Sequence, residues 1–149
     1  MMLEKILNSV NLLYPETTLT VTFCLLILAD LILRKRGNST ALIALLGLFV
    51  TAYFVVQQIS TGANSIFSNM LAVDSFSIYF KFVILASAIF VVIFSMQFTE
   101  LTRGKRSVAE YYAILIALTL GLFLMTGSTN LLMMYLSLEL SSISSYILA

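Results

Sequence analysis

The sequence predicts an all-α integral membrane protein, a bundle of five transmembrane helices, and three observations point to this class. Hydrophobic residues make up 60% of the 149 residues and charged residues only 10%, whereas about 25% of the residues of a soluble domain are charged. Apolar windows long enough to cross the hydrocarbon layer, which takes about 20 helical residues, occur at five places. Basic connecting segments alternate with a non-basic one, as in membrane proteins.

The five predicted spans form one bundle, because no linker, low-complexity segment or internal repeat divides the chain. They cover residues 12–33, 41–59, 76–98, 110–126 and 130–149. The first span does not read as a signal peptide, since its apolar stretch is too long and no small-residue cleavage pattern follows it.

Local signals mark the helix ends. Tyr14-Pro15-Glu16 predicts a helix start, since proline is tolerated at the first helical position and Glu16 would face the positive end of the helix dipole. The segment 37–39 predicts a turn and the segment 60–65 a loop. Ser107 and Glu110 have the spacing of a capping box at the start of the fourth span.

Three further signals concern charged residues and a turn. Asp30 and Arg34 are four residues apart, which favours a helical ion pair. Asp74 precedes the third span, where cap or dipole chemistry is expected. The turn over 127–130 is very short, so the fourth and fifth spans should be antiparallel neighbours.

The distribution of basic residues predicts the orientation in the membrane. Arg34-Lys35-Arg36 follows the first span, and Arg103, Lys105 and Arg106 precede the fourth, whereas residues 60–75 include no Lys or Arg. By the positive-inside rule both basic segments are cytoplasmic. The N-terminus is then outside, and all five spans alternate without conflict.

Composition also excludes several kinds of partner and site. Neither the net charge of +1 nor any basic patch predicts nucleic-acid binding. The single Cys24 forms no internal disulfide. One cysteine without any histidine cannot hold a zinc ion or an iron–sulfur cluster on this chain alone. The expected surroundings are a lipid bilayer.

Glu139 is the main candidate for function. It lies near the middle of the fifth span, where an ionised carboxylate costs about 2.5–3.5 kcal/mol on insertion scales. Tyr135, Ser142 and Tyr146 fall within about 60° of one another and of Glu139 on a helix, and they form a polar stripe. Such a stripe favours a proton or ion path, and the alternative is a structural hydrogen bond within the bundle. The serines at 137, 141, 144 and 145 lie on the other side, where small residues let a neighbouring helix approach closely.

Lys81 is the second charge inside a predicted span, near its outer end. Its long side chain either reaches the headgroups or has a buried partner, and the sequence alone leaves both open.

The order and spacing of several segments resemble the N-type subunit of respiratory complex I, the proton-translocating NADH–quinone oxidoreductase. These segments are 14–16, 28–30, 71–81, 109–113 and 130–149. The most specific part is Glu110-Tyr111-Tyr112 together with the later run from Leu136 to Ser142.

The resemblance implies that this chain is the front part of an antiporter-like fold of about fourteen helices. It implies that Glu139 transfers protons and pairs with a lysine on a later helix, supported by Tyr135, Ser142 and Tyr146, with Lys81 as a further candidate. The lysine partner is expected on another polypeptide or on a continuation of this chain. Flavin, iron–sulfur clusters and quinone are expected on other subunits, with no cofactor on this chain. The expected partners are other membrane subunits, including antiporter-like ones, in a prokaryotic plasma membrane or another energy-transducing membrane.

Two alternatives stay open at this stage. One is a subunit of a multisubunit cation/proton antiporter or a membrane-bound hydrogenase, which share this ancestry. The other is a small membrane scaffold protein without a transport role.

Overall fold

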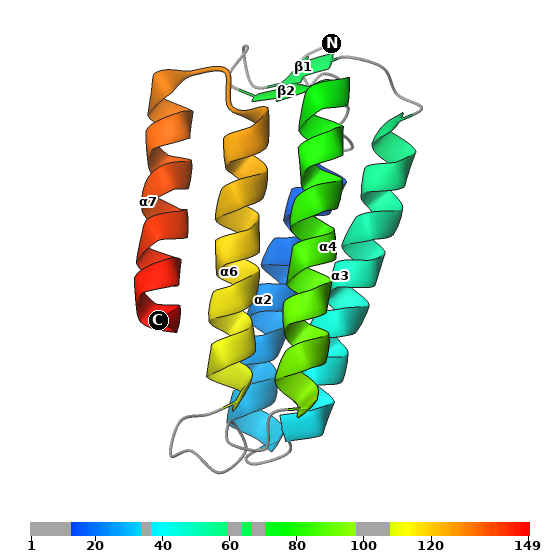
Figure 1. Cartoon of the computed structure of the whole chain (residues 1–149), viewed down its shortest axis with the longest axis vertical. Helices are drawn as coiled ribbons and strands as arrows, with labels where there is room; N and C mark the ends of the chain where they lie inside the picture. Colours follow the sequence, from blue (N-terminus) through cyan, green and yellow to red (C-terminus); the bar gives the residue numbers. More distant parts are fainter. Residues whose placement is uncertain (1–12, 34–36, 60–63, 67–70, 98–107) are drawn as a thin grey trace.

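The computed structural model describes residues 13–33, 37–59, 64–66, 71–97 and 108–149. Within these residues, the chain forms a bundle of long helices with a small hairpin at one end (Figure 1). The helices are α2 (Tyr14–Leu33), α3 (Gly37–Ile59), α4 (Ser75–Gln97), α6 (Val108–Gly127) and α7 (Leu131–Leu148). All five are long and apolar enough to cross a membrane, which confirms the predicted fold class.

Two short strands connect α3 with α4. β1 (Asn64–Ile66) pairs antiparallel with β2 (Leu71–Val73), and Leu71 also forms a bridge to Ser128 between α6 and α7. The expectation of a loop over 60–65 is therefore wrong for Asn64 and Ser65, while 60–63 lie outside the described residues. Pairing supplies hydrogen-bond partners for backbone groups that a loop leaves to water.

The expected turn over 37–39 is also corrected, because α3 already begins at Gly37. Glycine and asparagine are accepted in the first turn of a helix, where the backbone N–H groups have no helical partner to lose.

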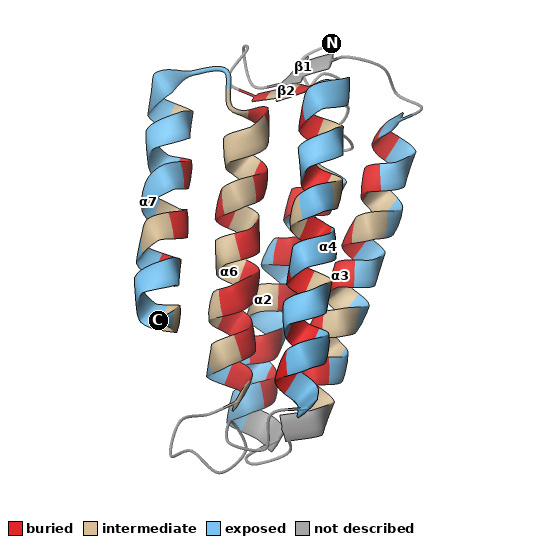
Figure 2. Cartoon of the chain, in the orientation of Figure 1, coloured by how far each residue is buried: buried red, intermediate tan, exposed pale blue. Residues whose placement is uncertain are grey.

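Helix α6 is the centre of the bundle. It packs against α2, α3, α4 and α7, whereas α7 lies on the outside against α6 (Figures 1 and 2). Of the membrane-length window of α6, 44% is buried, against 11% for α7. Helix α4 buries one face at helical spacing. The residues of that face are Ser77, Lys81, Leu85, Ala88, Val92 and Ser95.

The contact between α6 and α7 is made by small residues, as predicted. Ser137, Ser141 and Ser144 are buried, whereas Ser145 is exposed. Gly121 of α6 lies against Ser141, where an added Cβ would come within 3.0 Å of the Ser141 backbone nitrogen. The two backbones therefore approach closely, as small residues allow in membranes.

Two helix starts are capped by side chains. The Ser77 backbone N–H donates to Asp74 Oδ1 at 2.8 Å, which confirms a capping role for Asp74. Asn130 Oδ1 accepts from the Leu132 N–H at 3.2 Å and caps α7. Glu110 lies exposed in the first turn of α6, and its predicted partner Ser107 lies outside the described residues. The predicted Asp30–Arg34 pair is likewise untested, because Arg34 lies outside them.

Candidate functional site

Helix α7 places the predicted polar stripe on the face that points away from α6. Tyr135, Glu139 and Tyr146 are exposed, and Ser142 is half-buried (Figure 2). The serine face of α7 occupies the contact with α6, so the opposite face of the helix is left uncovered by the part of the chain that the structure describes.

Within the stripe, the structure brings Tyr135 and Glu139 together. The Tyr135 phenol interacts with the Glu139 carboxylate one helical turn away. The Ser142 hydroxyl instead donates to the backbone carbonyl of Glu139 at 3.1 Å. Tyr146 is 80% exposed. The part of the stripe that reaches the carboxylate is therefore Tyr135.

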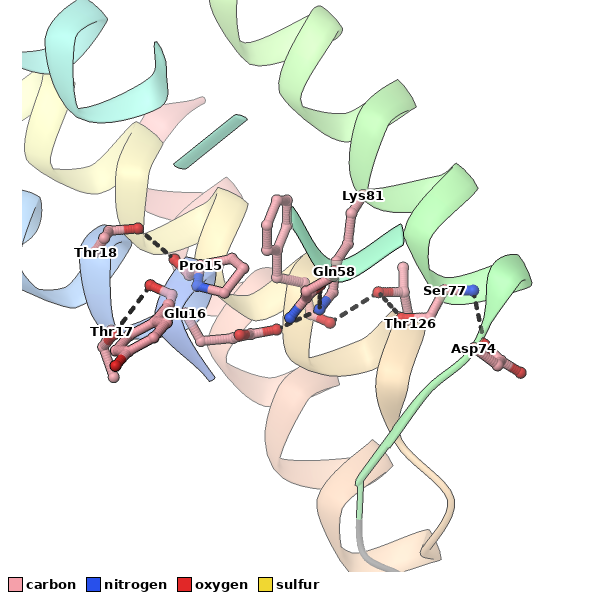
Figure 3. A network of polar contacts seen from close by, with 11 residues as sticks. Pro15, Glu16, Thr17, Thr18, Gln58, Asp74, Ser77, Lys81 and Thr126 are labelled. Atoms are coloured by element: carbon pink, nitrogen blue, oxygen red, sulfur yellow. Dashed lines mark hydrogen bonds and ion pairs between the residues drawn. The ribbon is translucent and has the colours of Figure 1, made fainter. Parts of the chain in front are cut away.

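A second polar cluster, which we call the Lys81 cluster, lies inside the bundle. Lys81 Nζ donates to Glu16 Oε1 at 2.5 Å and to Gln58 Oε1 at 3.3 Å (Figure 3). The side chain of Lys81 is 2% exposed and that of Glu16 is 11% exposed. The ammonium also lies 5.6 Å from the centre of the Phe123 ring, within cation–π range.

Four helices supply one residue each to the Lys81 cluster. Glu16 lies in the first turn of α2, Gln58 is the penultimate residue of α3, and Lys81 is the seventh residue of α4. Phe123 is four residues before the end of α6. All four positions are close to the end of the bundle that bears the hairpin, so the antiparallel helices bring them to one level (Figure 1).

The cluster shows which of the two expectations for Lys81 holds, and it adds a partner to Glu16 beyond the expected helix-dipole position. Lys81 does not reach toward headgroups but has a buried partner. Glu16 begins α2 as predicted, yet its carboxylate points into the bundle and binds Lys81 as well as lying near the helix dipole. Gln58 was missed, and its only signal in the sequence is an amide in the last turn of an apolar span.

The Lys81 cluster and the Glu139 stripe are separate. Lys81 is on α4 and Glu139 on α7, and α6 lies between these helices (Figure 1). Among the described residues, no group of three or more His, Cys, Asp or Glu side chains is placed to hold a metal ion.

Comparison with known proteins identifies the family. No protein-family model matches the chain. It is 40% identical over 136 residues to "NADH-quinone oxidoreductase subunit N 2" of Chloroherpeton thalassium, covering 90% of this chain and 27% of that protein. It is 35% identical over 142 residues to subunit N of Chlorobium chlorochromatii, covering 95% of this chain and 28% of that protein.

A chloroplast relative extends the match to nearly the whole chain. The "NAD(P)H-quinone oxidoreductase subunit 2, chloroplastic" of Chlorokybus atmophyticus is 32% identical over 148 residues, covering 97% of this chain and 29% of that protein. The chain thus spans a little over a quarter of the length of these relatives. We conclude that this membrane-spanning helical chain belongs to the family of N-type subunits of NADH–quinone oxidoreductase.

Proposed function

We propose that the chain forms part of the proton-moving membrane portion of a NADH–quinone oxidoreductase, and that Glu139 is the group that takes up and releases the proton. The observation that carries this proposal is the placement of Glu139, beside Tyr135, on the uncovered face of a membrane-length helix. A carboxylate at this depth is costly against lipid and is accommodated beside water or a cation.

The length of the relatives supports the expectation that another helix covers Glu139 in the full-length subunit. Since the chain spans 27–29% of their length, further helices are available to pack on the uncovered face of α7. A lysine on such a helix favours the ionised form of Glu139 when it is near, and its withdrawal favours the protonated form. Alternation between these two arrangements moves one proton per cycle.

The other stripe residues have supporting roles in this proposal. Tyr135 offers its hydroxyl to the carboxylate one turn away, and Ser142 and Tyr146 offer hydroxyl groups to water along the same face. Lys81 is an additional candidate on a different helix. The electron-transfer groups, flavin, iron–sulfur clusters and quinone, are expected on other subunits. The names of the relatives favour this assembly over a cation/proton antiporter or a hydrogenase.

The test is the change Glu139→Gln in the full-length subunit of the assembled complex, in sealed inverted vesicles. We expect fewer protons pumped per NADH oxidised, with the complex still assembled. Glu139→Asp is the matched control, because it keeps a carboxylate at the position, and it should retain more pumping than Glu139→Gln. Wild-type pumping by a normally assembled Glu139→Gln complex would show that the proposal is wrong and would favour a scaffold role.

A further inference from the structure

We propose that Glu16 and Lys81 form a second proton-exchange site, separate from Glu139 and open to the hairpin end of the bundle. This inference rests on the proposed function, because it assumes that the assembled complex moves protons. Beyond the proposed role of Glu139, the inference assigns proton exchange to one residue on α2 and one on α4. It also states that the proton leaves toward the hairpin end.

The first argument is the hydrogen bonding of Glu16. Its Oε1 accepts from Lys81, whereas its Oε2 is buried and has no hydrogen-bond partner among the described residues. Buried carboxylate oxygens are normally satisfied. A water molecule bound to Oε2 would supply the hydrogen bond that the described residues do not, and it would also accept the proton that Glu16 releases.

The second argument is the free-energy cost of burying the Glu16–Lys81 ion pair. Two ions removed from water rarely stabilise a fold more than apolar side chains of similar volume do. Apolar side chains such as Leu19, Leu85 and Phe123 form the hydrophobic core of this bundle, and Glu16 and Lys81 are the charged side chains among its buried described residues. An ion pair retained at this position therefore calls for a role beyond packing.

The third argument is the chemistry of the pair. The Lys81 ammonium gives its proton to Glu16 across the 2.5 Å hydrogen bond, which leaves a neutral amine beside a carboxylic acid. The acid then releases the proton to water at the hairpin end, and the amine takes a proton from water on the opposite side. One proton has crossed, and the pair has returned to its starting charges.

The fourth argument is the presence of polar groups between the pair and the hairpin end. Ser77 lies one turn before Lys81 on the same buried face of α4, and its hydroxyl is 3.5 Å from that of Thr126 (Figure 3). The Ser77 N–H is in turn bonded to the exposed Asp74. Ser77, Thr126 and Asp74 thus place polar groups on the hairpin side of the pair, and Gln58 lies beside it.

The test compares variants in the assembled complex, with protons pumped per NADH oxidised as the readout. Lys81→Arg keeps a cation for Glu16, but a guanidinium does not release its proton in proteins. The double variant Glu16→Gln/Lys81→Met removes both charges and leaves no unpaired ion. We expect both to assemble and both to lose part of the pumping. The matched control is Thr119→Val, which removes a buried hydroxyl bonded to the Leu115 carbonyl of its own helix.

The outcomes separate this site from Glu139. Wild-type pumping by both pair variants would overturn the inference even if Glu139→Gln loses pumping. Loss of pumping in the pair variants together with wild-type pumping in Glu139→Gln would support the Lys81 cluster and reject the Glu139 proposal. Failure of every pair variant to assemble, while Thr119→Val assembles, would assign the pair to folding and overturn the inference.

Discussion

Gly121 and Ser141 lie so close across the α6–α7 contact that a side chain at the glycine position would push against the backbone of Ser141. A Cβ at Gly121 would lie 3.0 Å from the backbone nitrogen of Ser141 and 3.2 Å from its Cα. These are backbone atoms, which cannot rotate away. The close approach of the two helices at this point therefore depends on glycine at position 121.

Gly121→Val is expected to weaken the attachment of α7. Forcing extra atoms into a close contact costs about 1–3 kcal/mol, and the strain here falls on backbone. Thermal unfolding of the purified full-length subunit in detergent should show a lower midpoint. Leu118→Val, which introduces the same branched side chain into α6 without added volume, should have a smaller effect. Equal midpoints for Gly121→Val and the wild type would contradict the close contact.

A second close contact joins α2 to α3. A Cβ at Gly47 would lie 2.2 Å from Thr22 Cγ2, and the Thr22 hydroxyl donates to the Thr18 carbonyl at 2.7 Å. Gly47→Ala should therefore displace Thr22 and lower stability by about 1–3 kcal/mol. Adding Thr22→Ala removes the clashing methyl and hydroxyl groups, so the double variant should regain part of the loss in the same unfolding assay. If the stability losses of the two single variants simply added up in the double variant, the clash would not be between these two side chains.

Tyr135→Phe tests the one stripe residue that reaches the carboxylate. Removing the phenol hydroxyl takes away an interaction with Glu139 but leaves the carboxyl group itself. We expect a loss of proton pumping smaller than that of Glu139→Gln. Tyr146→Phe serves as the comparison on the same face, because Tyr146 is 80% exposed. A larger loss of proton pumping for Tyr146→Phe than for Tyr135→Phe would show that Tyr146 supports Glu139 more than Tyr135 does.

The orientation in the membrane is testable with single cysteines in a Cys24→Ser background of the full-length subunit. Thr129→Cys, exposed between α6 and α7, should react with a membrane-impermeant maleimide added to intact cells. Gly104→Cys, in the basic segment between the third and fourth spans, should react only after the cells are permeabilised. The opposite pattern would place the N-terminus inside.

The helices are predictable from the sequence because each one must supply its own backbone hydrogen bonds in lipid and must be long enough to cross it. These two demands leave a strong local signal in every span. The hairpin has no such signal: its strands are three residues each, too short for an alternating pattern to stand out from a loop.

The Glu16–Lys81 pair is not predictable, because 65 residues separate the partners. Each charge also has a sufficient local explanation, a helix dipole for Glu16 and the headgroups for Lys81. One signal is present in the sequence, because both residues lie within two turns of the same expected membrane surface. Antiparallel helices bring residues near that surface to the same level of the bundle. The stripe on α7 was predictable as a pattern, but its direction was not. That direction depends on the serine face fitting against Gly121.

The bridge between Leu71 and Ser128 has a mechanical consequence. It joins the strand that leads into α4 to the turn that leads into α7, so the starts of these two helices, on opposite sides of α6, are tied together at the hairpin end. The helix that carries Glu139 and the helix that carries Lys81 are thus linked by backbone pairing at their starts, in addition to their packing against α6.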